Sequence, residues 1–223
     1  MEGINLIHGD SLQALKGYAD NHFDVAIVDP PYGIGASNVK SYECKGKRKQ
    51  SYSTTKHTPK KWDNEIPSKE YFTELFRVSK NQLIFGANYF TKYLPSSKGW
   101  IVWDKKLGDN NFSMGELVYT SFNKPLKIAS IFHGANRISW NEQLAKVNAK
   151  IHPTQKPIKL YKWLIDRYTN EGDLILDTHL GSGSIAIACH YMKRKLIGYE
   201  IDKEYYDAAC KRFKEQTSQQ ALW

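Results

Sequence analysis

The stretch that most constrains the fold is DVAIVDPPYG, near the start of the chain. Residues 25–28 form a short, continuous apolar run, which is typical of a parallel strand buried on both faces. Pro30 and Pro31 cannot continue a strand ladder, and Pro30 favours an extended backbone at Asp29. We therefore expect Asp29 at the carboxyl end of a central strand, where open α/β sheets bind their ligands. A stiff turn there would hold a hydrogen-bond acceptor beside the flat Tyr32 side chain, an arrangement suited to a planar ring that carries an amino group.

A second constrained unit lies near the other end of the sequence. Residues 173–177 predict a strand, the glycine turn GSG at 181–183 follows, and a helix and a strand ending at Glu200 come next. The glycines would let a ligand approach the backbone, and Glu200 could accept hydrogen bonds from ribose hydroxyls. The turn also matches the dinucleotide fingerprint G-x-G-x-x-A. Only about forty residues follow it, whereas a dinucleotide-binding domain needs several strands after its glycine turn. A nucleoside cofactor therefore fits better than NAD.

Three motifs together resemble those of the amino-group DNA methyltransferases that use S-adenosylmethionine. They are DPPY at 29–32, HPTQKP at 152–157 and DTHLGSG at 177–183. The catalytic motif comes first and the cofactor motif last, which resembles the circularly permuted β class of the family. The similarity covers residues 4–35 and 151–215 well and the strands between them loosely. It implies an α/β fold with a single doubly wound, mostly parallel sheet of the class I methyltransferase type.

The resemblance also implies a role for each matching residue. Asp29 and the Pro30 carbonyl would accept hydrogen bonds from the exocyclic amine of the target base, and Tyr32 would stack on the extruded ring. The cofactor motif would border the methionine part of S-adenosylmethionine, Glu200 its ribose and Asp10 its adenine. The expected catalytic residues are Asp29, Pro30, Pro31 and Tyr32. The expected cofactor-binding residues are Asp10, Lys156, Asp177, His179, Gly181, Ser182, Gly183 and Glu200, and no metal is expected.

The sequence departs from the family pattern inside the cofactor motif, where Thr178 and His179 replace a proline and an aromatic residue. An imidazole can still pack flat against a ligand. The chemistry depends mostly on positioning and electrostatics, because two acceptors aimed at an aromatic amine can favour a pyramidal nitrogen without a strongly basic side chain. The base must leave the duplex first, and stacking on Tyr32 would help to offset that cost. Methylation at a ring carbon would need a cysteine nucleophile, and no cysteine here follows a proline at a strand end.

Several of these residues have a structural alternative that the sequence leaves open. Asp29 and Asp177 stand where acids end strands and cap turns, and Asp10 is equally suited to be a helix N-cap. Apart from its motif, Lys156 would be interpreted as a surface lysine. His152 is as compatible with a structural role as with a functional one.

Charge and loop composition indicate the partner. Lysine and arginine outnumber aspartate and glutamate by 32 to 23, for a formal charge of +9, which favours a polyanion. The resemblance makes double-stranded DNA the expected partner. The segment 36–62 lacks periodicity and is rich in lysine, so we expect either a DNA-contacting basic loop or a solvated one. We expect a small target-recognition insert at about 108–150, with the whole chain 1–223 forming a single methyltransferase domain.

Apolar periodicity predicts the remaining elements. Helices are expected at about 12–18, from Ser68 onward, and at 157–168, 184–192 and 203–215. Strands are expected at 4–7, 82–86, 100–104 and 196–200. Residues 116–121 and 127–132 are expected to pair as a hairpin about Asn123-Lys124-Pro125. Glu116 and Asp109, at the edge of these strands, are expected to be ordinary surface acids.

The chain carries no sign of export. Its three widely spaced cysteines form no disulfide pattern, no apolar run approaches transmembrane length, and the N-terminus lacks a signal pattern. We expect a cytoplasmic protein that does not engage membranes. Oligomeric state stays open, with a homodimer as one alternative. The recognition sequence and the existence of a partner nuclease in a restriction-modification system also stay open.

The sequence therefore predicts a site-specific methyltransferase that acts on the N6 amine of adenine in DNA. Aspartate at the first position of DPPY resembles the adenine members more than the N4-cytosine members. N4-cytosine methylation and RNA adenine methylation remain alternatives. A different class is a basic nucleic-acid-binding module with a degenerate cofactor site, which calorimetry with S-adenosylmethionine would separate from an enzyme.

Overall fold

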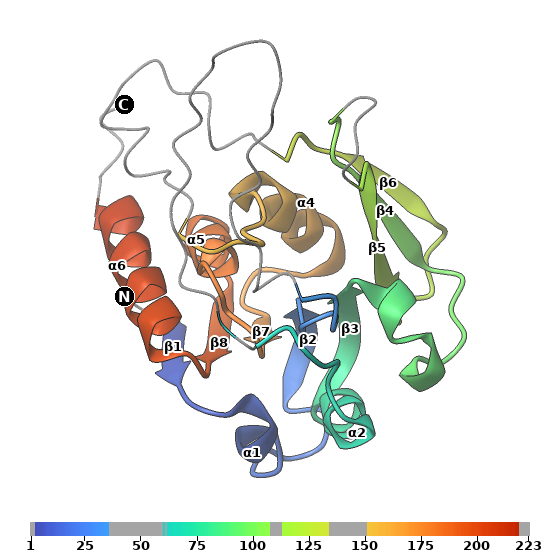
Figure 1. The fold of residues 1–223 in the computed structure, drawn as a ribbon, viewed down its shortest axis with the longest axis horizontal. Helices are drawn as coiled ribbons and strands as arrows, with labels where there is room; N and C mark the ends of the chain where they lie inside the picture. The colour runs from blue at the N-terminus through green and yellow to red at the C-terminus, as the bar shows by residue number, and fades with distance from the viewer. Residues whose placement is uncertain (1–2, 36–59, 61, 108–112, 134–150, 219–223) are drawn as a thin grey trace.

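A computed structural model of the chain describes residues 3–35, 60, 62–107, 113–133 and 151–218. Within these residues, eight strands form one sheet in the order β1-β8-β7-β2-β3-β5-β4-β6 (Figure 1). Their bounds are β1 Ile4–His8, β2 Phe23–Val28, β3 Ser79–Phe85, β4 Trp100–Asp104, β5 Gly115–Thr120, β6 Lys127–Ser130, β7 Leu174–Asp177 and β8 Lys195–Glu200. The predicted single, mostly parallel sheet is confirmed.

The direction of β5 distinguishes one side of this sheet. β5 runs antiparallel to both of its neighbours, β3 and β4, whereas β6 pairs with β4 in parallel. The hairpin expected from residues 116–121 and 127–132 is therefore wrong, because β4 lies between β5 and β6. The physical reason is burial: Ile101 and Trp103 of β4 are fully buried, and they lie in register with Val118 of β5 and Ala129 of β6, respectively. The local turn signal at Asn123-Lys124-Pro125 is weaker than this shared core.

Helices cover both faces of the sheet (Figure 1). α1 (Ser11–Leu15) and α2 (Lys69–Val78) pack on one face. α4 (Ile158–Tyr168), α5 (Ser184–Tyr191) and α6 (Lys203–Ser218) pack on the other. Two short 3-10 helices, η2 (Ala87–Tyr89) and η3 (Thr91–Tyr93), follow β3. This is the doubly wound arrangement that the resemblance implies.

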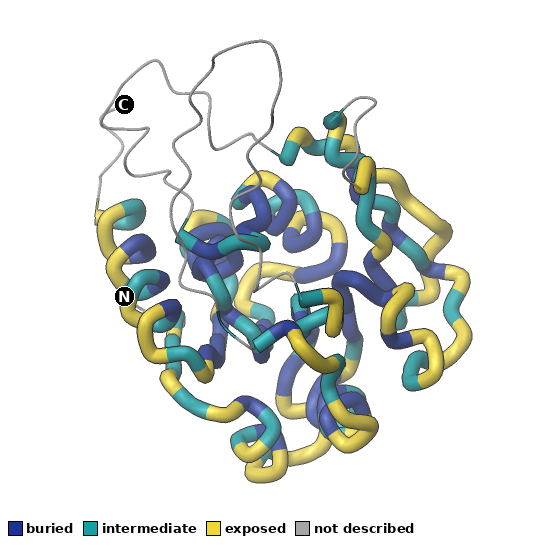
Figure 2. Tube along the Cα trace, viewed as in Figure 1, coloured by how far each residue is buried: buried dark blue, intermediate teal, exposed yellow. Residues whose placement is uncertain are grey.

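The central strand β2 is buried on both faces, as its apolar run predicts. Val25 and Ile27 belong to the core under α4 and α5, whereas Ala26 and Val28 belong to the core under α2. All four side chains are at most 2% exposed, and Figure 2 shows the strands at the centre of the fold as buried. Full burial of each larger aliphatic side chain contributes about 1.5–3 kcal/mol. The carboxyl end of β2 is therefore a rigid support for Asp29.

Helix α2 is capped at Ser68, the residue at which the sequence predicts its start. The Ser68 hydroxyl accepts a hydrogen bond from the Tyr71 backbone N–H at 3.3 Å, which satisfies one of the free donors of the first turn. Tyr71, Phe72 and Leu75 form its buried face with Val78. Because Tyr71 lies in the first turn, this cap also determines where its phenol meets the carboxyl edge of the sheet.

The two predicted loop regions are only partly described. The range 108–150, in which we expect a target-recognition insert, contributes β5 and β6 to the main sheet. Residues 108–112 and 134–150, and nearly all of the basic loop 36–62, lie outside the described residues. The division into a core, a basic loop and an insert therefore stays a prediction.

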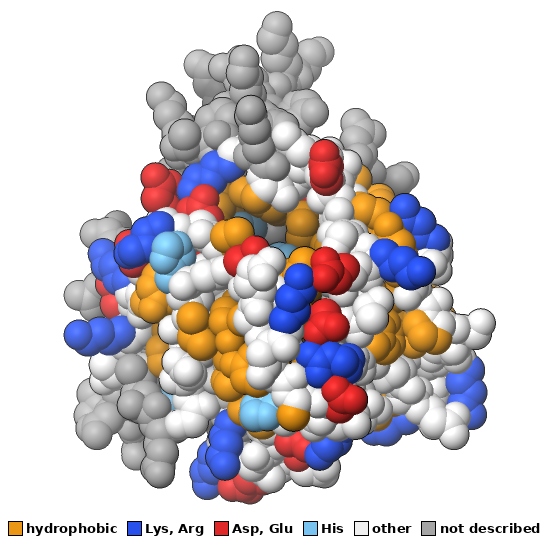
Figure 3. Space-filling view, turned by 90° about the horizontal axis from the view of Figure 1, so that it is seen from below, with side chains coloured by type: hydrophobic (Ala, Val, Ile, Leu, Met, Phe, Trp, Pro, Cys, Tyr) orange, Lys and Arg blue, Asp and Glu red, His pale blue; other side chains and the backbone are white. Residues whose placement is uncertain are grey.

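The surface and the helices of the described part carry two further observations. On the face drawn in Figure 3, lysine and arginine side chains alternate with aspartate and glutamate, so the excess positive charge does not gather there. Among the helices that the structure describes, none is long and apolar enough to cross a membrane.

Candidate active site

Four acidic residues lie at the carboxyl ends of four adjacent strands. Asp10 follows β1, Glu200 ends β8, Asp177 ends β7 and Asp29 follows β2. These strands are parallel neighbours in the order β1-β8-β7-β2. The structure thus brings the DPPY motif and the cofactor motif, about 150 residues apart in the chain, to one edge of one sheet, as strand-end placement predicts.

The turn of DPPY is held by Asp63, which the sequence analysis did not identify. Asp63 is 1% exposed, and its Oδ1 accepts hydrogen bonds from the backbone N–H of Tyr32 at 2.7 Å and of Gly33 at 3.0 Å. Its carbonyl accepts a further bond from Gly35 N–H at 2.9 Å. A buried carboxylate bonded to two backbone donors is a strong constraint on backbone position. No pattern marks Asp63, because it follows an aperiodic segment.

The Tyr32 ring occupies a space that only glycine at position 86 leaves open. Gly86 follows β3 with φ of +62°, and a methyl group there would lie within 2.6 Å of three Tyr32 ring atoms. On the same side of the sheet, Tyr89 of η2 is stacked on Tyr32 with ring centroids 5.1 Å apart and planes 13° apart. Tyr89 is 42% exposed. Neither residue was predicted from the sequence, although a glycine directly after a buried strand is a usable signal.

Asp29 is engaged through both carboxylate oxygens. Its Oδ1 accepts a hydrogen bond from the Tyr32 hydroxyl at 2.6 Å, and its Oδ2 pairs with the Lys156 ammonium. Lys156 also lies 3.3 Å from the Tyr32 hydroxyl and 3.4 Å from Oε2 of Glu116. The other oxygen of Glu116 pairs with Lys105 at 2.7 Å. Two carboxylates and two ammonium groups therefore form one compact, charge-balanced cluster.

Burial and charge act against each other in this cluster. Burial raises the pKa of the Asp29 carboxyl, and the Lys156 ammonium only partly offsets it. Burial acts in the opposite sense on Lys156, but Asp29 and Glu116 outweigh it, so the pKa of Lys156 lies above its usual value. For Glu116, burial is outweighed by Lys156 and Lys105, and its pKa lies below its usual value. Glu116 is thus the carboxylate that these cations keep most firmly ionised.

Two structural alternatives from the sequence analysis are wrong. Lys156 is not a surface lysine, because it is 4% exposed and faces Asp29. Glu116 is not an ordinary surface acid, because its side chain is 19% exposed and contacts Lys156, Lys105 and the Tyr32 hydroxyl. The misplacement of Glu116 follows from the hairpin error: β5 is a central antiparallel strand, so its first residues lie at the carboxyl edge of the parallel strands. Asp109 lies outside the described residues.

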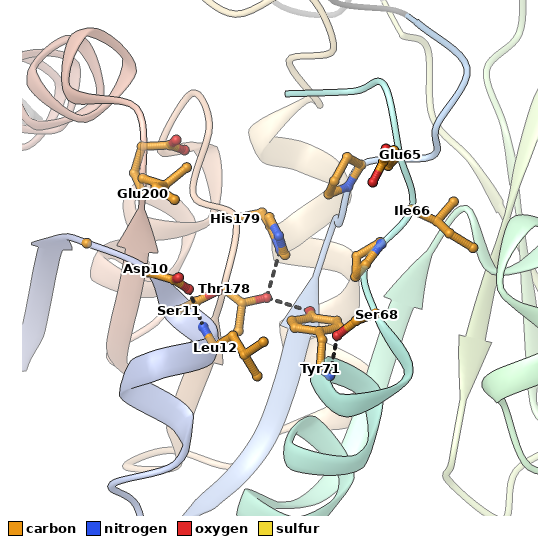
Figure 4. Close-up of a pocket in the computed structure, with 14 residues that line it drawn as sticks. Asp10, Ser11, Leu12, Glu65, Ile66, Ser68, Tyr71, Thr178, His179 and Glu200 are labelled. Carbon is orange, nitrogen blue, oxygen red and sulfur yellow. Dashed lines mark hydrogen bonds between the residues drawn. The ribbon is translucent and has the colours of Figure 1, made fainter. Parts of the chain in front are cut away.

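A cavity of about 210 Å³ lies beside this cluster at the same edge of the sheet (Figure 4). Three predicted cofactor residues line it: Asp10, His179 and Glu200. Glu65, Ile66 and Pro67, which follow the basic loop, form part of the opposite wall, as Figure 4 shows for Glu65 and Ile66. The remaining lining residues are Gly9, Ser11, Leu12, Pro31, Ser68, Tyr71, Thr178 and Ile201. The cavity therefore combines apolar surfaces that suit a purine with acids that suit its amine or sugar hydroxyls.

Thr178 and His179, which depart from the family pattern, form a hydrogen-bonded wall of the cavity together with Tyr71. The Thr178 hydroxyl lies 2.7 Å from the Tyr71 hydroxyl and 2.9 Å from Nδ1 of His179 (Figure 4). The His179 ring packs edge-on against Tyr71 at 5.5 Å between centroids. Burial lowers the pKa of His179 to about 4, so its imidazole is neutral at pH 7. His179 thus presents an uncharged aromatic surface, as an aromatic residue at this position would.

The glycine turn of the cofactor motif holds Glu200 in place. Glu200 Oε2 accepts a hydrogen bond from Gly181 N–H at 2.8 Å, and its Oε1 accepts one from Asp202 N–H at 2.9 Å. Gly183 has φ of +68°, and a methyl group there would lie 3.2 Å from the Ala209 side chain in α6. Ser182 is buried against α5 and α6 through Ser184 and Arg212 and does not line the cavity.

Asp177 and Asp10 test whether this edge suits S-adenosylmethionine. Asp177 is 1% exposed, accepts a hydrogen bond from His179 N–H at 3.0 Å, and has its pKa raised to about 8 by burial. A nearby cation would favour the ionised form of this buried carboxyl, and the cofactor carries an α-ammonium group. Asp10 caps α1 through Leu12 N–H at 2.8 Å and also lines the cavity, so both of its predicted roles are compatible with the geometry. The residues present therefore fit this cofactor, and their contacts with it stay predictions.

His152 has a packing environment rather than an open one. Its ring lies 5.0 Å from Trp62 and 4.4 Å from Tyr205 between centroids, and its Nδ1 lies 3.1 Å from the Thr154 hydroxyl. This arrangement supports the structural alternative for His152. No group of three or more metal-ligating side chains occurs among the residues that the structure describes.

Known proteins resemble this chain over nearly its whole length. A family model for N6/N4 enzymes, described as DNA methylase, matches residues 102–211. Type II methyltransferase M2.DpnII of Streptococcus pneumoniae is 42% identical, over 95% of this chain and 90% of its own. DNA adenine methyltransferase YhdJ of Escherichia coli K12 is 26% identical, over 95% of this chain and 83% of its own.

Solved structures show the same fold at low identity. The PvuII DNA methyltransferase, which is cytosine-N4-specific, matches with a TM-score of 0.62 at 17% identity, over 98% of this chain and 91% of its own. The M1.HpyAVI complex with S-adenosylmethionine matches with a TM-score of 0.54 at 20% identity, over 94% of this chain and 98% of its own. The sheet and its helices are thus those of known DNA methyltransferases.

Proposed function

Because the chain belongs to the family of N6/N4 DNA methylases, we propose that it transfers a methyl group from S-adenosylmethionine to the N6 amine of adenine in DNA. The observation that carries this proposal is the placement of Asp29 of DPPY and Asp177 of the cofactor motif at the ends of the paired strands β2 and β7. One carboxylate is suited to an amine and the other to a cationic cofactor. Each motif alone has a structural explanation, whereas their meeting at one edge does not.

The cofactor is held in this proposal by the acids and the glycine turn at the edge. Asp177 pairs with its ammonium group, Glu200 with its ribose hydroxyls, and Asp10 with its adenine beside the His179 surface. Gly181 and Gly183 let the backbone approach it, and Lys156 flanks its methionine end. S-adenosylmethionine, when bound, supplies a methyl group activated on a sulfonium.

The DPPY residues position the acceptor amine. Asp29 and the Pro30 carbonyl accept hydrogen bonds from the two amine hydrogens. These bonds draw the nitrogen lone pair out of conjugation with the ring and direct the lone pair toward the cofactor. Pro31 keeps this turn rigid, and Asp63 holds it through two backbone donors. Tyr32 stacks on the extruded base, which takes the place of the exposed Tyr89 ring on the face of Tyr32. Positioning, rather than a strong general base, is the contribution of this chain.

Adenine is the favoured target because DPPY starts with aspartate and because the relative YhdJ is named a DNA adenine methyltransferase. N4-cytosine methylation is the second candidate, since the PvuII enzyme has the same fold and is named cytosine-N4-specific. Both reactions need the same acceptor pair on an exocyclic amine. The size of the base and the edge it presents distinguish them.

The finer assignments of partner and place also belong to this proposal. Double-stranded DNA in the cytoplasm is the substrate, with the basic loop 36–62 contacting phosphates and the insert at about 108–150 reading bases. Its relative M2.DpnII is named a type II methyltransferase, so we propose a role in restriction-modification. A homodimer stays one alternative for its assembly.

The test is transfer of a tritiated methyl group from S-adenosylmethionine to genomic DNA from a host without N6-methyladenine and, in a parallel reaction, to total RNA from the same host. Nucleoside chromatography after digestion should place the label in N6-methyladenine. Label in N4-methylcytosine would identify cytosine as the target base, and label only in RNA would identify RNA as the substrate. Cofactor binding without any transfer, or no binding at all, would refute the enzyme.

A further inference from the structure

Both carboxylate oxygens of Asp29 are already engaged in this structure. The Tyr32 hydroxyl and the Lys156 ammonium are bonded to its two carboxylate oxygens. An ammonium on Oδ2 also lowers the acceptor strength of the whole carboxylate, because its positive charge withdraws electron density. The target amine needs this carboxylate as an acceptor for one hydrogen, so it competes with both partners for Asp29.

Lys156 cannot leave Asp29 for solvent. Its side chain is 3% exposed, and a buried ammonium without a partner is strongly destabilised. Glu116 is the second carboxylate within reach, with Oε2 3.4 Å from the Lys156 Nζ. A small rotation of either side chain would convert this distance into a short ion pair. Glu116 is thus the acceptor that the described cluster provides for a displaced Lys156.

The same oxygen can receive the Tyr32 hydroxyl. Its distance to Glu116 Oε2 is 3.4 Å, against 2.6 Å to Asp29, and a phenol can rotate its single proton from one acceptor to the other. Lys105 binds the other oxygen of Glu116 at 2.7 Å and so keeps the carboxylate ionised and oriented. Glu116 is therefore poised, through one oxygen, toward both groups that occupy Asp29.

We propose that Glu116 is a positioning residue for methyl transfer: it takes over Lys156 and the Tyr32 hydroxyl from Asp29, which leaves Asp29 free to accept a hydrogen bond from the target amine. The inference rests on the proposed function, since it needs an amine to bind Asp29. It assigns β5 and the end of β4, which carry Glu116 and Lys105, a part in the reaction. Glu116 itself does not contact the reacting atoms.

The test is Glu116→Gln, which keeps the shape and removes the charge. Single-turnover transfer at pH 7.5 is expected to fall by about tenfold or more, the factor of one charged hydrogen bond. The dissociation constants for S-adenosylmethionine and for DNA stay within about twofold, because cofactor contacts and phosphate contacts are untouched. Glu116→Asp, which keeps the charge, should recover most of the rate, since the flexible Lys156 can follow it.

Glu70→Gln is the matched control. Glu70 forms a surface ion pair with Lys16 at 2.8 Å on α2, and its removal should leave the rate unchanged. A wild-type rate in Glu116→Gln would overturn the inference while leaving the proposed function intact. A rate loss accompanied by clear losses of thermal stability and of cofactor affinity would also overturn the inference, because that result means a purely structural role for Glu116. An inactive wild-type protein would instead overturn the proposed function and this inference with it.

Discussion

Replacing Gly86 with alanine tests whether the position of Tyr32 controls transfer. At Gly86, φ is +62°, a backbone conformation that costs an alanine about 1–2 kcal/mol. Its methyl group would lie within 2.6 Å of three Tyr32 ring atoms. Ordinary carbon contacts begin at about 3.5 Å, and the nearest Tyr32 atom would lie 2.1 Å from this methyl group, so the ring must move by about 1.4 Å. Such a shift breaks the 2.6 Å bond between the Tyr32 hydroxyl and Asp29. A misplacement of about 1 Å in a positioned site can lower a rate by about 100-fold.

The assay compares Gly86→Ala with Gly172→Ala in thermal melts, cofactor calorimetry and single-turnover transfer. Gly172 has φ of +86° and open space around it, so its alanine variant carries the same kind of backbone strain without displacing a side chain. Gly172→Ala should melt roughly 2–8 °C lower than wild type, and Gly86→Ala lower still because its methyl group also displaces Tyr32. Both variants should bind S-adenosylmethionine normally. Only Gly86→Ala should lose transfer, by about 100-fold. Equal transfer rates in the two variants would refute the reasoning that the Tyr32 position matters.

Further predictions concern Asp29, Asp177 and the basic loop. Asp29→Ala should lower transfer by roughly 100-fold or more while cofactor binding is retained, because it removes an acceptor of the amine; a near-normal rate would place the site elsewhere. Because burial raises the pKa of Asp177 to about 8, this carboxyl is protonated at pH 7, and pairing with the cofactor ammonium should release about one proton. Calorimetry in phosphate and Tris buffers measures that proton, and identical heats would contradict it. Since burial raises the pKa of Asp177 from 3.8 to about 8, the folded protein should lose stability progressively as pH rises between these values. Melts of the cofactor-free protein should show this loss for wild type but not for Asp177→Asn. Neutralising the basic loop should weaken DNA binding and flatten its dependence on salt, and an unchanged slope would mean a solvated loop; the residues to change are Lys45, Lys47, Arg48 and Lys49.

The sequence motifs predicted the site best where local chemistry and strand position agree. Pro30 and Pro31 end β2 directly after a fully buried run, so Asp29 had one natural place, at the carboxyl edge of the sheet. The glycine turn likewise placed Asp177 and Glu200 relative to each other, since a strand, a turn and a strand leave little freedom between them. These predictions depended on periodicity and on residues close together in the chain.

Sequence patterns were weakest where a side chain depends on distant neighbours. Glu116 has the local pattern of a surface acid, and only the placement of β5 between β3 and β4 brings it close to Lys156 and Lys105. Asp63 follows an aperiodic segment, yet the fold brings it under the Tyr32 backbone. Neither residue carries a signal in its own stretch of chain.

The sequence by itself determined the DPPY turn, the glycine turn and the strands that precede them, because prolines, glycines and apolar runs act on their own neighbourhood. It also predicted Asp29 as an acceptor beside an aromatic ring. Only the tertiary structure decided that Asp29 is occupied, by Tyr32 and Lys156, and that Glu116 stands ready to receive both. The physical reason is that the electrostatic environment of a buried charge is set by groups from other strands, which no local pattern contains.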